Sequence, residues 1–240
     1  PPPPFDPPED LGFIYITDQG GLQECVEDLE GTTVLAVDTE ADSFYSYEES
    51  CCLIQMTGDS GPDYVIDPLK VDDLSPLDKL MADPKVIKIF HGADYDVVSL
   101  KRDFGFTIRG IFDTMIAAQA GGHQRFGLGD LVNHYFGVKL NKKYQRHDWS
   151  SRPLKPEHLA YARLDSHFLP KLMKILYPLA EANGRAPMLE EEFELLQHRK
   201  WSRRPFSPDD CMKIKGANKL GPEERKVLRA VFMARDERAR

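Results

Sequence analysis

Two carboxylates close the most strongly β-forming run of this sequence, and they limit what the chain can fold into. Residues 33–38 favour β structure and end at Asp38, which predicts a buried strand. Successive strand side chains point to opposite faces, so Asp38 and Glu40 project together. Like charges held this close repel each other, and a cation between them relieves the repulsion. The pattern favours a cation site at a strand end; the alternative is a pair of solvated acids entering a turn.

The rest of the hydrophobic pattern predicts an α/β domain with a mixed sheet. Further strands are expected at residues 51–57, 63–67, 86–90 and, as a short extended piece, 110–113. Helices are expected at residues 19–29, 74–81, 93–104, 114–120 and 157–177. Gly105 is placed to end the third helix, and Pro170 to kink or break the last one.

Composition is ordinary for a globular protein. The 240 residues suffice for one domain and a small appendage, with 41% hydrophobic and 29% charged residues. We find no apolar stretch of bilayer-spanning length and no signal-peptide pattern, so no membrane partner is expected. The start at Pro1, without an initiator Met, predicts a processed or excised piece of a longer protein. Four cysteines without CxxC spacing predict reduced, partly buried thiols of a cytoplasmic protein rather than disulfides or zinc ligands.

The net charge of −8 is unevenly distributed along the chain. Residues 1–96 hold 22 acidic and 4 basic residues, whereas residues 97–240 hold 17 acidic and 27 basic ones. This asymmetry indicates one surface that collects cations and another that meets phosphates, although a solvated acidic face is the commoner cause.

Four parts of the chain differ in composition. The Pro-rich, acidic residues 1–10 are expected to form a disordered or loosely docked arm. The α/β domain is assigned to residues 11–184 and a helical linker to residues 185–204. Residues 205–240 are expected to hold two short helices, at 209–220 and 222–238. This stretch is too short for an independent core, so we interpret it as part of a helical domain.

Two further carboxylate sites lie along the chain. The strand ending at residue 90 leads into Asp94 and Asp96, which lie about 200° apart on a helix, so they cannot both face one site. Tyr161 and Asp165 have the i, i+4 spacing that places them on one helical face. Taken alone, Asp94 and Asp96 are more typical of ordinary helix capping, and Tyr161 and Asp165 of a core aromatic and a surface acid.

Together, three carboxylate sites and a tyrosine are suited to a two-metal cluster. Hard oxygen ligands favour two divalent cations, Mg²⁺ or Mn²⁺. Such a pair, about 3.5–4 Å apart, activates a water and stabilises the leaving oxygen in phosphodiester hydrolysis. The tyrosine is suited to orient that water.

A basic segment, residues 139–155, contains six Lys or Arg and one acidic residue, with Tyr144, His147 and Trp149 interleaved. Cations follow phosphates and aromatic rings stack on unpaired bases, so the segment is a candidate nucleic-acid contact; a solvated loop is the plainer interpretation.

The motifs resemble those of the tyrosine-type DEDD 3′-5′ exonucleases. Asp38-x-Glu40, Asp96 and Tyr161-x-x-x-Asp165 match the three family motifs in order. The resemblance is strongest to ribonuclease D and its eukaryotic relative, the nuclear exosome exonuclease, and covers residues 11–180. Supporting matches are Phe90-His-Gly-Ala, Phe112-Asp-Thr, Lys143-Tyr-Gln, Asp148-Trp, Arg152-Pro-Leu and Tyr161-Ala-Arg.

The resemblance implies a ribonuclease H-like mixed sheet flanked by helices, and metal-dependent release of nucleoside 5′-monophosphates from RNA 3′ ends in RNA processing or turnover. It implies that Tyr161 orients the attacking water and excludes Asp94, because the family's second acid ends the HGAxxD pattern. The metal ligands that it implies are Asp38, Glu40, Asp96 and Asp165. It further implies that residues 205–240 open an incomplete HRDC-like helical domain. Location would be cytoplasmic for a bacterial-type enzyme and nuclear for a eukaryotic relative.

The chemistry of the side chains suggests further contacts to RNA with a single-stranded 3′ end. For Trp149, packing and stacking are equally consistent with the sequence. The candidate substrate-binding residues are Gln55, His91, Lys143, Tyr144, Trp149 and Arg152. Two alternatives are a single-stranded DNA 3′-5′ exonuclease and a non-catalytic RNA-binding scaffold. The intact set of four acids and a tyrosine favours an enzyme over the scaffold.

Overall fold

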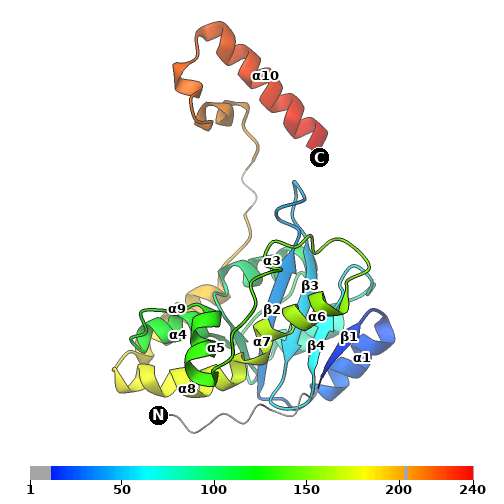
Figure 1. The fold of residues 1–240 in the computed structure, drawn as a ribbon, viewed down its shortest axis with the longest axis vertical. Coiled ribbons are helices and arrows are strands. Elements are labelled where there is room, and N and C mark those ends of the chain that lie inside the picture. Colours follow the sequence, from blue (N-terminus) through cyan, green and yellow to red (C-terminus); the bar gives the residue numbers. More distant parts are fainter. Residues whose placement is uncertain (1–11, 203–204, 240) are drawn as a thin grey trace.

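The computed structural model describes residues 12–202 and 205–239. A six-stranded mixed sheet forms the centre, in the order β1-β4-β3-β2-β5-β6 (Figure 1). Strand β2 pairs antiparallel with β3 and parallel with β5, so it lies in the middle of the sheet. The strands are β1 Phe13–Ile16, β2 Val34–Ala41, β3 Cys51–Thr57, β4 Asp63–Ile66, β5 Ile87–Phe90 and β6 Ile111–Asp113.

The predicted strands are confirmed, and one was missed. Strand β1 is a four-residue edge strand that pairs in parallel with β4, 50 residues later. Strand β3 is buried along its whole length, and the apolar start of β2 is buried beside it. Strand β1 is as apolar in sequence as these central strands, but it is a short edge strand with no alternation to mark it.

Helices flank the sheet, and the domain forms the α/β architecture that the sequence predicts. Figure 1 shows α6 and α7 crossing in front of β2, β3 and β4. Helix α7 contacts β2 and β3, while α8 contacts β2 and β5. The helices of this domain are α1 Gln19–Asp28, α2 Ser75–Ala82, α3 Asp94–Phe104, α4 Thr114–Ala120, α5 Leu128–Phe136, α6 Pro156–Ala162, α7 Leu164–His167, α8 Leu169–Ala182 and α9 Ala186–Gln197.

The long helix predicted for residues 157–177 is wrong in its continuity. The chain there forms α6, α7 and α8 in succession, with Arg163 and Phe168 at the two joints. Pro170 lies in the first turn of α8, where its missing N–H costs no helical hydrogen bond, so it begins that helix rather than kinking one. Helix α5 was also missed. Gly105 ends α3 at φ 69°, as predicted.

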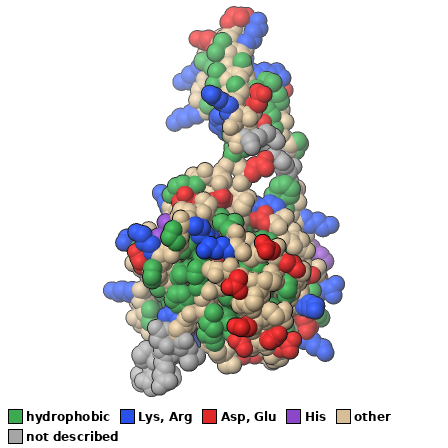
Figure 2. Space-filling view, turned by 90° about the vertical axis from the view of Figure 1, so that its right-hand side faces the viewer, with side chains coloured by type: hydrophobic (Ala, Val, Ile, Leu, Met, Phe, Trp, Pro, Cys, Tyr) green, Lys and Arg blue, Asp and Glu red, His purple; other side chains and the backbone are tan. Residues whose placement is uncertain are grey.

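The C-terminal residues form a helical unit, drawn in orange and red in Figure 1, that projects from one end of the α/β domain in Figure 2. The two parts touch where the Tyr47 hydroxyl, in the loop between β2 and β3, donates to the Asp236 carboxylate. The helix α10 Pro222–Ala239 is close to its prediction. The helix expected at 209–220 is wrong: two 3₁₀ turns, Pro208–Lys213 and Ala217–Lys219, occupy that stretch. Gly216, at φ 95°, separates them because an α-helix does not pass through that conformation.

The interior agrees with the predicted redox state of the cysteines. Cys25, Cys51, Cys52 and Cys211 are all buried free thiols. Burial raises the pKa of the Cys25 and Cys52 thiols to about 12. Within residues 12–202 and 205–239, no helix is both long and apolar enough to cross a bilayer. The arm predicted at residues 1–10 lies outside the described residues.

Candidate active site

Three carboxylates from two elements meet at the middle of the sheet. Asp38 and Glu40 project from β2, and Asp165 lies on α7, which packs against β2. One oxygen of each carboxylate lies within 4.8 Å of the others. The strand alternation that pairs Asp38 with Glu40 thus brings both to the face that α7 covers.

Asp96 joins this group through β2. It lies buried in the first turn of α3, and its Oδ1 accepts hydrogen bonds from the Thr39 amide at 3.1 Å and the Thr39 hydroxyl at 2.5 Å. Thr39 is the residue between Asp38 and Glu40, so one strand segment both supplies two acids and fixes a third. Asp94, by contrast, is exposed and pairs with Arg199 at 2.8 Å, in agreement with its exclusion.

The carboxylates destabilise one another's charge. Burial, and then the neighbouring Asp96, Asp165 and Glu40, raise the pKa of Asp38 well above its ordinary value. Burial, Asp165 and Asp96 raise the pKa of Glu40 in the same way. Burial and Asp96 raise the pKa of Asp165 to about 7. Burial also raises the pKa of Asp96 to about 7, although the Thr39 hydrogen bonds oppose it.

This donor set fits divalent cations. The ion pairs found in residues 12–202 and 205–239 include none of the four acids. Clustered carboxylate oxygens without a protein cation are hard ligands of the kind that Mg²⁺ and Mn²⁺ prefer. A bound cation would hold these acids ionised against the repulsion that raises their pKa values.

Tyr161 faces the same cleft from the end of α6. Its ring stacks on Trp149 with centroids 6.1 Å apart and meets the Tyr144 ring edge-on at 5.7 Å. Burial and the carboxylates of Asp165, Glu40 and Asp38 raise the pKa of its phenol. The phenol therefore keeps its proton at neutral pH and is held rigidly beside the acids.

Asp38 and Asp165 line a cleft of about 320 Å³. Two residues that the sequence left unnamed, Lys142 and Gln145, line it along with the start of α5. Both belong to the basic-aromatic segment, which gave the signal, but its sequence does not show which side chains turn inward. His91 also lines the cleft, and its Nδ1 lies 2.9 Å from the Thr114 hydroxyl. Burial lowers the pKa of His91, which keeps it neutral at physiological pH.

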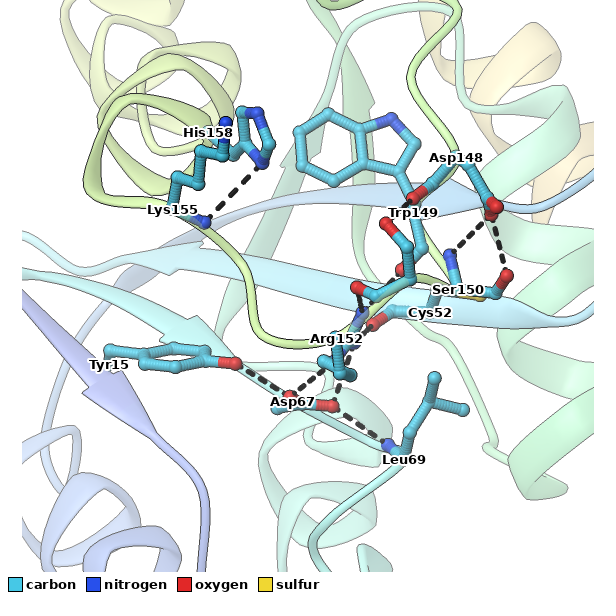
Figure 3. Close-up of polar contacts among 11 residues, drawn as sticks. Tyr15, Cys52, Asp67, Leu69, Asp148, Trp149, Ser150, Arg152, Lys155 and His158 are labelled. Carbon is cyan, nitrogen blue, oxygen red and sulfur yellow. Dashed lines mark hydrogen bonds and ion pairs between the residues drawn. The ribbon is translucent and has the colours of Figure 1, made fainter.

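Arg152 is engaged by internal partners. Its guanidinium forms a two-pronged ion pair with Asp67, at 2.8 and 2.9 Å, and donates to the carbonyls of Cys52 and Trp149 (Figure 3). The Tyr15 hydroxyl donates to the same carboxylate at 2.6 Å. All these contacts are internal, so Arg152 fastens the basic segment to the sheet instead of presenting a free cation.

The other predicted substrate contacts divide between interior and surface. Trp149 is 1% exposed and Gln55 is fully buried, so neither side chain presents a surface to a base. Gln55 lies directly opposite Asp38 across β2 and β3, and its amide atoms have no hydrogen-bond partner. Lys143 is exposed, with its ammonium 4.9 Å from the Tyr144 ring centroid, and Tyr144 is half-buried against Tyr161.

Sequence comparison agrees with this geometry. A family model described as 3′-5′ exonuclease matches residues 13–181. Exosome complex exonuclease RRP6 of Saccharomyces cerevisiae is 36% identical over 199 residues, which cover 81% of this chain and 27% of the yeast protein. Human exosome complex component 10 is 37% identical over 166 residues, which cover 69% of this chain and 19% of the human protein. The chain thus spans about a quarter of the length of these relatives or less.

Solved structures show the same fold. The catalytic core of RRP6 from Trypanosoma brucei is 31% identical, with a TM-score of 0.87 over 98% of this chain and 66% of that one. RNase D of Escherichia coli, described as an exoribonuclease involved in structured RNA processing, is 27% identical, with a TM-score of 0.75 over 95% of this chain and 62% of that one. The predicted ribonuclease H-like architecture is confirmed. The chain therefore belongs to the ribonuclease D-like 3′-5′ exonuclease family.

Proposed function

We propose that this chain hydrolyses RNA stepwise from a single-stranded 3′ end and releases nucleoside 5′-monophosphates. The observation that carries the proposal is the cluster of the Asp38, Glu40 and Asp165 carboxylates at a cleft that Asp38, Asp165 and Tyr161 line. Four acids and a phenol are the groups that phosphodiester hydrolysis with two divalent cations needs.

Each residue has a distinct part in this proposal. Asp38, Glu40, Asp96 and Asp165 would hold two Mg²⁺ or Mn²⁺ ions, which would supply Lewis acidity and lower the pKa of water. The Tyr161 hydroxyl donates a hydrogen bond that orients the attacking water, since its raised pKa keeps it protonated. The Lys142 ammonium, at the cleft wall, neutralises a phosphate of the incoming strand.

RNA rather than DNA is the proposed substrate because the relatives carry exosome and exoribonuclease names. The same names support a role in RNA processing together with an exosome. Hydroxyl-dependent discrimination against DNA would act through contacts to the 2′-OH.

The test is a time course on a 5′-labelled single-stranded RNA, with Mg²⁺, Mn²⁺ or EDTA in parallel. We expect a ladder that shortens from the 3′ end, disappears in EDTA and returns with either metal. A DNA of the same sequence run alongside tests the DNA exonuclease alternative. Internal cleavage, or full activity in EDTA, would refute the proposal; binding without any hydrolysis would favour the scaffold.

A further inference from the structure

The loop that joins β2 to β3 has a fixed shape. It starts two residues after Glu40, and Asp42 organises it. The Asp42 carbonyl accepts hydrogen bonds from the amides of Tyr45, at 2.7 Å, and Ser46, at 2.9 Å. The buried Asp42 carboxylate accepts from the Ser50 amide at 2.7 Å and so ties the loop's far end to its start. Side chains at the tip are therefore held in set directions.

Two aromatic rings at this tip face solvent. Phe44 is 70% exposed and Tyr45 is 57% exposed. A buried carboxylate holds the turn together, yet the turn presents its most apolar side chain outward. Large exposed aromatic side chains on a shaped loop are typical of binding surfaces.

The loop is joined to the basic-aromatic segment at Arg146. The Tyr45 hydroxyl donates to the Arg146 carbonyl at 2.8 Å. The Arg146 guanidinium lies 5.9 Å from the Phe44 ring centroid, within cation–π range. In Figure 1 the β2–β3 loop and the green loop of the basic segment lie at the same end of the sheet. A planar ring and a planar cation thus form one unit at the rim.

This unit continues the active cleft. Lys142 and Gln145 line the cleft, and Arg146 is the next residue along the chain. The nearby acid Glu49 is paired with Arg102 at 2.8 Å, so its charge is partly offset. Lys142 and Gln145 thus line the cleft, and the adjacent Arg146 contacts Phe44. A cationic track that ends in exposed aromatic rings matches the chemistry of an unpaired polynucleotide.

We propose that Phe44 and Arg146 form a stacking platform for an unpaired base of the RNA, upstream of the nucleotide being removed. The base stacks on the exposed Phe44 ring, and Arg146 holds that ring while its charge faces the adjoining phosphate. The proposal rests on the proposed function and adds a second point of contact on the same strand. Tight binding of longer RNA would then depend on the β2–β3 loop, whose hydrogen bonds described above involve none of the four clustered acids.

The test compares Phe44→Ala and Phe44→Trp in the full chain, with Met188→Ala on α9, at a side chain that is 60% exposed, as a matched control. Binding of an RNA of about a dozen nucleotides is measured in EDTA by fluorescence anisotropy, and hydrolysis of a dinucleotide is measured with Mg²⁺. We expect Phe44→Ala to weaken binding of the longer RNA about tenfold, with Phe44→Trp and Met188→Ala like wild type. Dinucleotide hydrolysis should be unchanged in all three.

Equal binding of the longer RNA by Phe44→Ala and wild type would overturn the platform and assign the rings to a protein partner instead. Equal losses on the dinucleotide and the longer RNA would also overturn it, because they would indicate damage to the cleft. A quench of 2-aminopurine placed upstream of the 3′ end, lost only in Phe44→Ala, would support it. Failure of the proposed function appears separately, as a wild-type chain that binds RNA and never shortens it.

Discussion

Asp67 and Asp38 are two acids of the same sheet with opposite surroundings. Asp67, at the end of β4, is fully buried and receives Arg152, Tyr15 and a backbone amide (Figure 3). Burial alone would raise its pKa, yet these hydrogen bonds hold the pKa below its ordinary value. Asp38 receives no cation from the described chain, and its pKa is raised.

The difference teaches how this fold distributes charge. A buried acid that is paired with a protein cation is compatible with a stable fold. Clustered acids without such a cation repel one another, which lowers the stability of the metal-free chain and raises its affinity for metal. Each prediction below tests one side of this contrast.

Asp38→Asn should give the largest effect. The amide keeps the size of the side chain but removes the charge, so metal affinity and turnover should fall together, turnover by about 10³-fold or more. Calorimetric metal titration and single-turnover rates on one RNA measure this. Without metal the variant should melt higher than wild type, because a repulsion has been removed. Wild-type turnover and metal dependence would contradict the two-metal assignment.

Arg152→Met should give the largest loss of stability. It leaves the Asp67 charge buried without its ion partner, which costs about 3–5 kcal/mol in the free energy of unfolding. Urea denaturation measures the loss, and the double variant with Asp67→Asn should recover most of it. Lys143→Ala is the control: an exposed cation whose removal should change stability by less than about 0.5 kcal/mol. That control should also flatten the salt dependence of RNA binding.

Tyr161→Phe should separate catalysis from binding. It removes one hydroxyl and leaves the ring between Trp149 and Tyr144, so metal and RNA affinities should stay near wild type. The kcat should fall by about 10²-fold, as for a lost proton-positioning group. Single-turnover rates at saturating RNA report this. A change confined to KM would make Tyr161 a packing residue for substrate.

Thr39→Val should give a smaller loss. The variant keeps the branched shape and the backbone donor but removes the hydroxyl that holds Asp96. Metal affinity should fall about tenfold, in the range expected for a group that orients a ligand. Thr39→Ser keeps the hydroxyl and should bind metal like wild type. If Val and Ser bind metal equally, the hydroxyl has no orienting part.

The pH dependence of the stability of the metal-free chain should report the same repulsion among the acids. Asp96 and Asp165 have folded pKa values of about 7, above the unfolded value, so the folded state binds more protons between about pH 4 and 7. The metal-free chain should lose stability as the pH rises through this window. Saturating Mg²⁺ should remove that slope, because it competes with the protons. Thermal melts across this window with and without Mg²⁺ measure it, and equal slopes would contradict the assignment.

The sequence predicts that these acids cluster because short-range geometry sets the directions of their side chains; their role as metal ligands stays a prediction. Strand alternation pairs Asp38 with Glu40, and β5 leads directly into the helix that carries Asp96. The prediction that Tyr161 and Asp165 share one face assumed a single continuous helix, and that assumption is wrong. The helix breaks at Arg163, yet both side chains still face the cleft.

The roles of Arg152 and Trp149 were not predictable from the sequence. Arg152 finds Asp67 at a separation of 85 residues, and no local pattern reveals that pairing. Trp149 lies in a basic segment whose composition is typical of a solvated loop. Its ring is buried because it packs in one cluster with side chains of β3 and α6. Strand β1 was missed because four edge residues carry too weak a period to distinguish from loop.

The buried thiols divide between the two parts of the chain: Cys25, Cys51 and Cys52 lie in the nuclease domain and Cys211 lies in the C-terminal unit. Thiol reagents attack the thiolate, which buried cysteines with raised pKa values form only after the surrounding structure opens. The labelling rate of each buried cysteine therefore reports how often the region around it opens. Mass spectrometry of a single labelling reaction would give both rates. The rate at Cys211 reports the opening of the smaller unit, and the rate at Cys51 reports the opening of the centre of the sheet.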